Sequence, residues 1–246
     1  MTVLSERMSA VTRLVTPGLR IADIGCDHAY LSLWLIQNEK AVHSIACDVN
    51  EGPLMKAESN IRQAGLSDVI ETRLGDGLQA ICPGEVDSVI IAGMGGLLMI
   101  KILNEGRSVT DSVRELILQP QSDIDLVRHY LEDNGFVIVS EDMVCEDGKF
   151  YPMMKAIHGN MEWEAEVFYR YGKILLREEN PVLHEFLIRE KRYLNDLADE
   201  LAAHSKEGCR AEERLKELKG AIAMNAVALR LMTTPGLFEI QRELLT

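Results

Sequence analysis

The fold of this chain is decided by residues 20–31, which read RIADIGCDHAYL. The apolar first half is typical of a short buried strand, and the second half opens a helix that we expect from about Ala29 to Gln37. Gly25 lies at the junction, where glycine permits a tight turn and a close approach of the backbone to a ligand. The stretch therefore predicts a strand, a ligand-binding turn and a helix.

Strands and helices alternate on both sides of this unit. An amphipathic helix precedes it, with Leu4, Met8, Val11 and Val15 on one face. For the helix expected at 122–134, Ser122 is the predicted N-cap and Leu126 faces the core. The remaining helices are predicted at 53–64 and 97–103, and further strands at 44–49, 69–74, 86–92, 116–118, 136–144 and 150–157. Asp147-Gly148 between the last two is a common hairpin signal, so the sequence predicts an α/β, Rossmann-like, seven-stranded sheet with an antiparallel edge.

The pattern changes after residue 160. Leucines recur at a 3.5-residue period from Leu187, and apolar residues then alternate steps of four and three up to Met232. We expect a C-terminal helical hairpin that turns at 205–208, with Asn225 as the one polar residue of its coiled-coil-like seam. The predicted domains are therefore 1–160 and 161–246.

Composition excludes several classes of protein. The 246 residues are 47% hydrophobic and 26% charged, which is typical of globular proteins, and the apolar run 89–100 is too short to span a bilayer. Glu6, Arg7 and Arg13 interrupt any signal peptide, so we expect a cytoplasmic protein. The five cysteines are scattered without a CxxC pair and predict reduced thiols and no metal site. The net charge of -13 argues against a general nucleic-acid coat but leaves room for a local basic patch.

The loops that follow the first four strands predict a cofactor site, because ligands bind at the carboxyl ends of such strands. Asp27 would disfavour a dinucleotide pyrophosphate and suits a cationic ligand such as S-adenosylmethionine (SAM). Asp48 is placed to accept from ribose hydroxyls, and Asp76 from an adenine amino group. The candidate cofactor-binding residues are Asp23, Gly25, Cys26, Asp27, His28, Asp48, Val49, Gly75, Asp76, Gly77, Ala92, Gly93, Met94 and Gly95.

Several motifs together resemble the TrmK-type tRNA (adenine-N1)-methyltransferases. They are DIGxDHAYL at 23–31, EGP at 51–53, GDGL at 75–78, IAGMGG at 91–96 and LQP at 118–120. The resemblance covers residues 1–160 and extends to the tail in architecture only. It implies a class I SAM-dependent methyltransferase that modifies N1 of the adenosine at tRNA position 22. The sequence departs from the family pattern at Cys26, Asp48, Gln121 and Pro152, where Ser, Glu, Asn and Glu are expected.

Adenine N1 carries a free lone pair at neutral pH, so its methylation needs alignment and desolvation rather than a general base. We expect Asp27, His28 and Tyr30 to form the catalytic pocket together with the loop 93–96 and with Gln119 and Pro120, which bind the substrate. Asp27 could hold either the adenine amino group or the ammonium of the cofactor. Candidate phosphate contacts, each of which could instead be an ordinary solvated helix residue, are Arg7, Arg13, Arg189, Lys191 and Arg192.

Two other functions use the same loops. A small-molecule methyltransferase would use the tail as a lid or dimerisation element and would not bind tRNA. A non-catalytic SAM-sensing module would use the tail to recruit a protein partner. The absence of an Asn-Pro-Pro-Tyr motif after the fourth strand argues against methylation of an exocyclic amino group. The sequence indicates neither DNA binding nor an oligomeric state.

Overall fold

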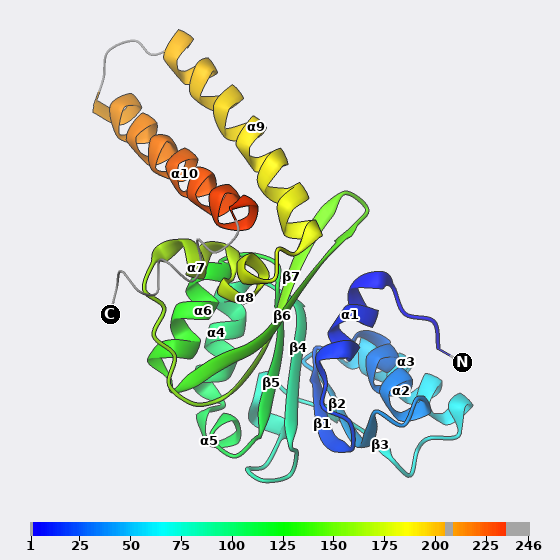
Figure 1. Cartoon of the computed structure of the whole chain (residues 1–246). Helices are drawn as coiled ribbons and strands as arrows, with labels where there is room; N and C mark the ends of the chain where they lie inside the picture. The colour runs from blue at the N-terminus through cyan, green and yellow to red at the C-terminus, as the bar shows by residue number, and fades with distance from the viewer. Residues whose placement is uncertain (1, 205–208, 235–246) are drawn as a thin grey trace. The chain divides into compact units, whose positions relative to one another are not determined.

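The computed structural model describes residues 2–204 and 209–234 (Figure 1). The chain forms two compact units that meet between Glu162 and Trp163. In the described part of the chain, no helix combines the length and apolar character needed to cross a membrane. The first unit contains the sheet, and the elements described in the second are all helices.

The sheet of the first unit has seven strands in the order β3-β2-β1-β4-β5-β7-β6. Strands β1 to β5 run parallel, and β7 lies antiparallel between β5 and β6. The Rossmann-like sheet with an antiparallel edge is thereby confirmed. Its strands are β1 (Leu19–Ile24), β2 (Ala41–Asp48), β3 (Ile70–Leu74), β4 (Ser88–Met94), β5 (Glu115–Pro120), β6 (Phe136–Glu146) and β7 (Lys149–His158).

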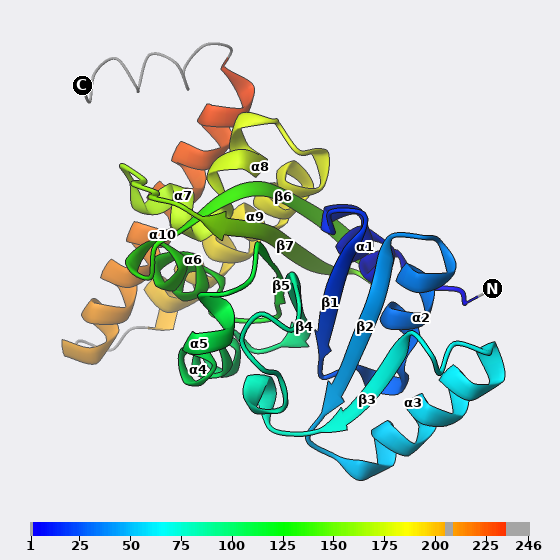
Figure 2. The same ribbon diagram turned by 90° about the horizontal axis from the view of Figure 1, so that it is seen from below.

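Helices cover both faces of this sheet (Figures 1 and 2). Helices α1 (Glu6–Leu14), α2 (Tyr30–Gln37) and α3 (Glu51–Ala64) pack together on one face. The other face carries α4 (Gly96–Glu105), α5 (Arg107–Thr110) and α6 (Ile124–Asp133). A sheet covered on both faces buries its central strands completely, and every residue of β5 is buried.

Two expectations for α6 are wrong. Asp123, rather than Ser122, occupies the N-cap position, with a left-handed φ of 51°. The Ser122 hydroxyl instead accepts from the backbone N–H of Gly96 at 3.3 Å, because the loops after β4 and β5 lie side by side. Leu126 is 43% exposed, since α6 buries Val127 and Leu131 instead.

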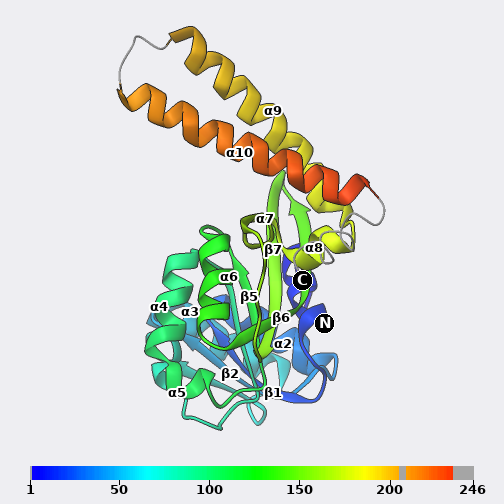
Figure 3. The ribbon, with the colours of Figure 1, turned by 60° about the vertical axis from the view of Figure 1, so that its left-hand side comes forward.

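The second unit consists of α7 (Glu166–Tyr171), α8 (Lys173–Arg177), α9 (Pro181–His204) and α10 (Cys209–Thr233). Helices α9 and α10 lie side by side (Figure 3), which confirms the helical hairpin. The Asn225 amide group of α10 is buried and donates to the Leu187 carbonyl oxygen at 3.0 Å and to Glu190 at 2.9 Å. The predicted turn at 205–208 lies outside the described residues.

Candidate functional site

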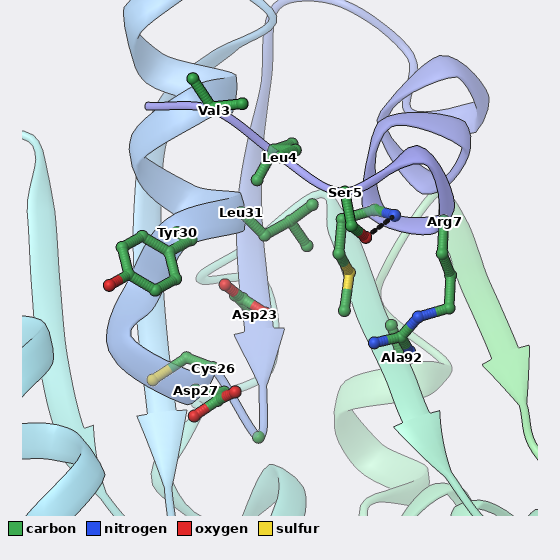
Figure 4. Close-up of a pocket in the computed structure, with 12 residues that line it drawn as sticks. Val3, Leu4, Ser5, Arg7, Asp23, Cys26, Asp27, Tyr30, Leu31 and Ala92 are labelled. Atoms are coloured by element: carbon green, nitrogen blue, oxygen red, sulfur yellow. Dashed lines mark hydrogen bonds between the residues drawn. The ribbon is translucent and has the colours of Figure 1, made fainter. Parts of the chain in front are cut away.

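A pocket of about 190 Å³ lies at the carboxyl end of β1 (Figure 4). Strands β1 and β4 are neighbours there although two strands separate them in sequence, so this is the switch point at which parallel sheets bind ligands. The strand ends and the loop after β1 form one side, and helix α1 with the residues before it forms the other. The lining residues are Val3, Leu4, Ser5, Arg7, Met8, Asp23, Gly25, Cys26, Asp27, Tyr30, Leu31 and Ala92.

The turn that follows β1 has an unusual backbone. Gly25 has a φ of +72°, and its N–H donates to the Cys47 carbonyl oxygen at 2.9 Å. Residues 27–29 have φ values of 29°, 67° and 60°, so three successive non-glycine residues adopt positive φ. Such residues are costly and persist only when the surrounding structure fixes them. Here Asn60 of α3 fixes the turn by donating to the His28 carbonyl oxygen at 3.0 Å.

Asp23 supplies a buried carboxylate to the pocket. Only 5% of its surface is exposed, and it accepts from the Ser32 hydroxyl at 2.8 Å, which in turn accepts from Ser44 at 2.9 Å. Burial raises the pKa of Asp23 to about 6 against the opposing effect of the Ser32 hydrogen bond, and Asp27 and Asp48 raise it further. A positively charged ligand group in this pocket would stabilise the ionised form.

The three predicted catalytic residues lie together on this turn. The His28 ring nitrogen Nε2 is 3.3 Å from Oδ1 of Asp27, and the rings of His28 and Tyr30 are stacked with their centroids 5.7 Å apart. Asp27 and Tyr30 line the pocket (Figure 4), and Tyr30 is 48% exposed. Tyr30 therefore presents an accessible aromatic ring at the pocket.

The residues predicted for the adenosine half of the cofactor lie at the ends of β2 and β3. Asp48 is paired with Leu74 in the parallel register, and its carbonyl oxygen accepts from the Gly75 N–H at 3.0 Å. The Asp48 carboxylate accepts from the Asn50 N–H at 2.8 Å, while Val49 and Asp76 are exposed. These residues do not line the pocket beside β1, but they continue the same edge of the sheet.

The loops after β4 and β5 are tied together by Gln119, which is fully buried. Its side-chain oxygen Oε1 accepts from the Gly93 N–H at 3.1 Å and from Nη1 of Arg7 at 2.9 Å, and its side-chain nitrogen Nε2 donates to the Pro120 carbonyl oxygen at 3.1 Å. The N–H of Gln121 donates to the Met94 carbonyl oxygen at 2.8 Å. Because both polar atoms of the Gln119 side chain have a partner, Gln119 holds these two loops and Arg7 together.

Comparison with known proteins identifies the family of this chain. Residues 4–154 match the family described as a methyltransferase domain. The Bacillus subtilis tRNA (adenine(22)-N(1))-methyltransferase is 32% identical over 222 residues, which are 87% of this chain and 92% of that protein. The chain belongs to the TrmK-type methyltransferase family.

Solved structures of TrmK-type proteins agree over nearly the whole chain. The B. subtilis m1A22 tRNA methyltransferase TrmK has a TM-score of 0.85 at 30% identity and covers 93% of this chain and 100% of its own. A Streptococcus pneumoniae protein described as a candidate tRNA (m1A22) methyltransferase was solved in complex with SAM. It has a TM-score of 0.83 at 33% identity and covers 92% of this chain and 100% of its own.

The basic residues predicted to contact phosphates in this TrmK-type chain have different surroundings. Arg7 lines the pocket beside β1, whereas Arg13 on the same helix pairs with Asp142 at 2.9 Å. On α9, Arg189 pairs with Glu185, and Lys191 and Arg192 are exposed. The sequence did not indicate that Ser5, Arg7 and Met8 line the pocket, because the pattern of a helix does not show which distant strand end it meets.

Proposed function

We propose that this chain transfers a methyl group from SAM to N1 of an adenosine in tRNA, at position 22 as its B. subtilis relative is named for doing. The observation that carries the proposal is the acidic pocket at the switch point, where Asp23 and Asp27 lie beside the glycine turn. A pocket with this charge suits a cationic ligand and disfavours a dinucleotide phosphate. The choice of tRNA as the methyl acceptor rests on the family.

The residues of this edge fit SAM along its length. Asp23 and Asp27 would face the charged methionine half, Asp48 would accept from the ribose hydroxyls, and Asp76 from the adenine amino group. Gly25 allows the closest approach, because its positive φ disfavours any side chain there. When bound, SAM supplies an electrophilic methyl group on a sulfonium centre.

The protein would act on the acceptor by placing and enclosing it. Adenine N1 needs no base to expose its lone pair, so orientation can supply up to about 7–11 kcal/mol of the barrier reduction in favourable cases. N1 lies on the Watson–Crick edge, so the base must leave its stack and enter the pocket. The Tyr30 ring, exposed and stacked on His28, would receive the flipped base, while the loops held by Gln119 close its other side.

We further propose that the helical unit from residue 163 onward contacts the tRNA. Lys191 and Arg192 are exposed on α9 and are available to phosphates. A local patch of this kind is compatible with the net charge of -13, because only the surface facing the RNA must be basic. A tRNA substrate also implies that the enzyme works in the cytoplasm.

Methyl transfer from labelled SAM to unmodified bulk tRNA tests the reaction, with mass spectrometry of the nucleosides. We expect 1-methyladenosine, and we expect a tRNA transcript with guanosine at position 22 to remain unmodified. Asp76→Ala should weaken SAM binding and lower turnover at limiting SAM, because it removes the acceptor for the adenine amino group. Methylation of a small molecule without any tRNA product would contradict the proposal.

Charge reversal tests the role of the helical unit. Lys191→Glu with Arg192→Glu should raise the KM for tRNA and leave the Kd for SAM unchanged. Lys216→Glu with Lys219→Glu is the matched control, because it places the same charge change on exposed positions of α10. If both pairs raise KM equally, the effect reflects total charge and the proposed α9 contact is wrong.

A further inference from the structure

Arg7 is the one basic side chain among the described residues that line the pocket. It comes from α1, ahead of the strands that carry the cofactor loops, and it faces Asp23 and Asp27 across the pocket (Figure 4). The charged lining therefore consists of two carboxylates and one guanidinium. Arg7 is therefore not an ordinary solvated residue on the outer face of the helix.

The Arg7 guanidinium is held in place by the protein. Nη1 donates to Oε1 of Gln119 at 2.9 Å, and the guanidinium carbon lies 5.2 Å from the centroid of the Tyr151 ring. The backbone of α1 is fixed as well, since the Arg7 N–H donates to Glu146 at 3.2 Å and Arg13 pairs with Asp142. An arginine ordered in this way loses little further freedom on binding.

Part of the guanidinium remains available. Within the part of the chain that the structure describes, Nε and Nη2 of Arg7 donate to no protein acceptor. Arginine donors arranged in a fork match the two oxygens of a carboxylate or phosphate. A ligand that also carries positive groups can pair with Asp23 and Asp27 at the same time, whereas an RNA phosphate brings only negative charge next to them and is therefore disfavoured.

The methionine half of SAM carries a sulfonium, an ammonium and a carboxylate. Two positive groups and one negative group are the charge complement of Asp23, Asp27 and Arg7. We propose that Arg7 binds the carboxylate of the methionine half, which makes helix α1 part of the cofactor site. This inference rests on the proposed use of SAM and assigns Arg7 to the cofactor rather than to tRNA.

Calorimetric titration with two ligands tests this contact. The ligands are S-adenosylhomocysteine and its decarboxylated analogue, which keeps the adenosine and the ammonium but lacks the carboxylate. We expect the unchanged protein to prefer S-adenosylhomocysteine by about 10- to 100-fold, the usual range for one hydrogen bond to a charged group. Arg7→Gln should remove this preference while changing the Kd of the decarboxylated analogue by less than about twofold.

Two further variants make the test specific. Arg7→Lys keeps the positive charge without the fork and should restore part of the preference. Arg13→Gln is the matched control on the same helix and should keep the full preference, because Arg13 pairs with Asp142 outside the pocket. Circular dichroism of each variant verifies that it is folded.

Three results would overturn the inference. Equal weakening of both ligands by Arg7→Gln would mean that Arg7 acts through Gln119 or the placement of α1. An unchanged protein with no preference between the ligands would show that the carboxylate is not recognised. Failure of the folded, unchanged protein to bind SAM or S-adenosylhomocysteine at all would instead overturn the proposed function, so the two failures are distinguishable.

Discussion

Replacing Asp23 with Asn is expected to stabilise the first unit and to weaken its binding of SAM. The Asp23 carboxylate is buried at the end of β1 and accepts from Ser32. An Asn side chain has nearly the same shape and keeps an oxygen for the Ser32 hydroxyl, while its amide nitrogen can meet water in the pocket that Asp23 lines. The substitution therefore removes a buried negative charge without removing the hydrogen bond.

The magnitude follows from the pKa of Asp23, which burial raises from 3.8 to about 6. A shift of this size corresponds to about 3 kcal/mol, because one pKa unit is worth about 1.4 kcal/mol. Because the pKa of Asp23 is higher in the folded than in the unfolded state, ionisation of Asp23 lowers the free energy of unfolding. This loss begins above the unfolded pKa of 3.8 and is complete only above the folded pKa of about 6. The advantage of Asp23→Asn should therefore grow from about 1.5 kcal/mol at pH 5 to about 3 kcal/mol at pH 8.

Urea unfolding at several pH values between 5 and 8 measures this difference. The matched control is Asp68→Asn, which changes an exposed acid before β3 and should alter the free energy of unfolding by less than about 0.5 kcal/mol. A variant that is less stable than the unchanged protein at pH 8, or a gain that does not vary with pH, would refute the reasoning. In parallel, the Kd of the unchanged protein for SAM should fall as the pH rises through 6, and that of Asp23→Asn should respond less.

Three further predictions concern stability. Gly25→Ala should lower the free energy of unfolding by about 1–2 kcal/mol because of its positive φ, and it should weaken SAM binding because its Cβ would lie 2.3 Å from the end of Met94; denaturation and calorimetry measure the two effects. Arg128→Met should cost about 3–5 kcal/mol in urea unfolding by removing the Arg128 charge from its ion pair with the buried Glu141 carboxylate, and adding Glu141→Leu should recover most of the loss. Asn225→Leu should raise the unfolding temperature of the helical unit by removing a buried amide oxygen that has no hydrogen-bond partner among the described residues, and a lower temperature by circular dichroism would contradict this.

Strands could be predicted from the sequence where all of their residues are buried or where a turn motif bounds them. Residues 116–118 are apolar and buried on both faces, and Asp147-Gly148 forms the expected turn with both residues at positive φ. Strand β2 begins at Ala41, three residues before the expected start, because exposed Val42 and half-buried His43 give no periodic signal. The prediction of Ser122 as the N-cap of α6 was wrong for a different reason, since its hydroxyl accepts a hydrogen bond from Gly96, in a loop distant in sequence.

The loops around the pocket and their acidic residues could be predicted from the sequence, but the place of Arg7 and the burial of Asp23 could not. Each loop follows a strand, so the order of the strands places the loops at one edge of the sheet. The position of Arg7 depends on a hydrogen bond to Gln119, 112 residues away, which no local pattern contains. The burial that raises the pKa of Asp23 likewise comes from packing in three dimensions.

The turn at 27–29 shows why this strand end is suited to ligand binding and less suited to stability. Glycine would relieve the positive φ of His28, but it would remove the ring that stacks on Tyr30 and lies beside Asp27. The strain, about 1–3 kcal/mol for each such residue, adds to the penalty of the ionised Asp23 next to it. Both costs fall on the end of β1 and the turn after it, which border the pocket, and a cationic ligand would offset the electrostatic cost. The unfavourable backbone and the buried charge are therefore best explained by binding, because neither contributes to the stability of the sheet.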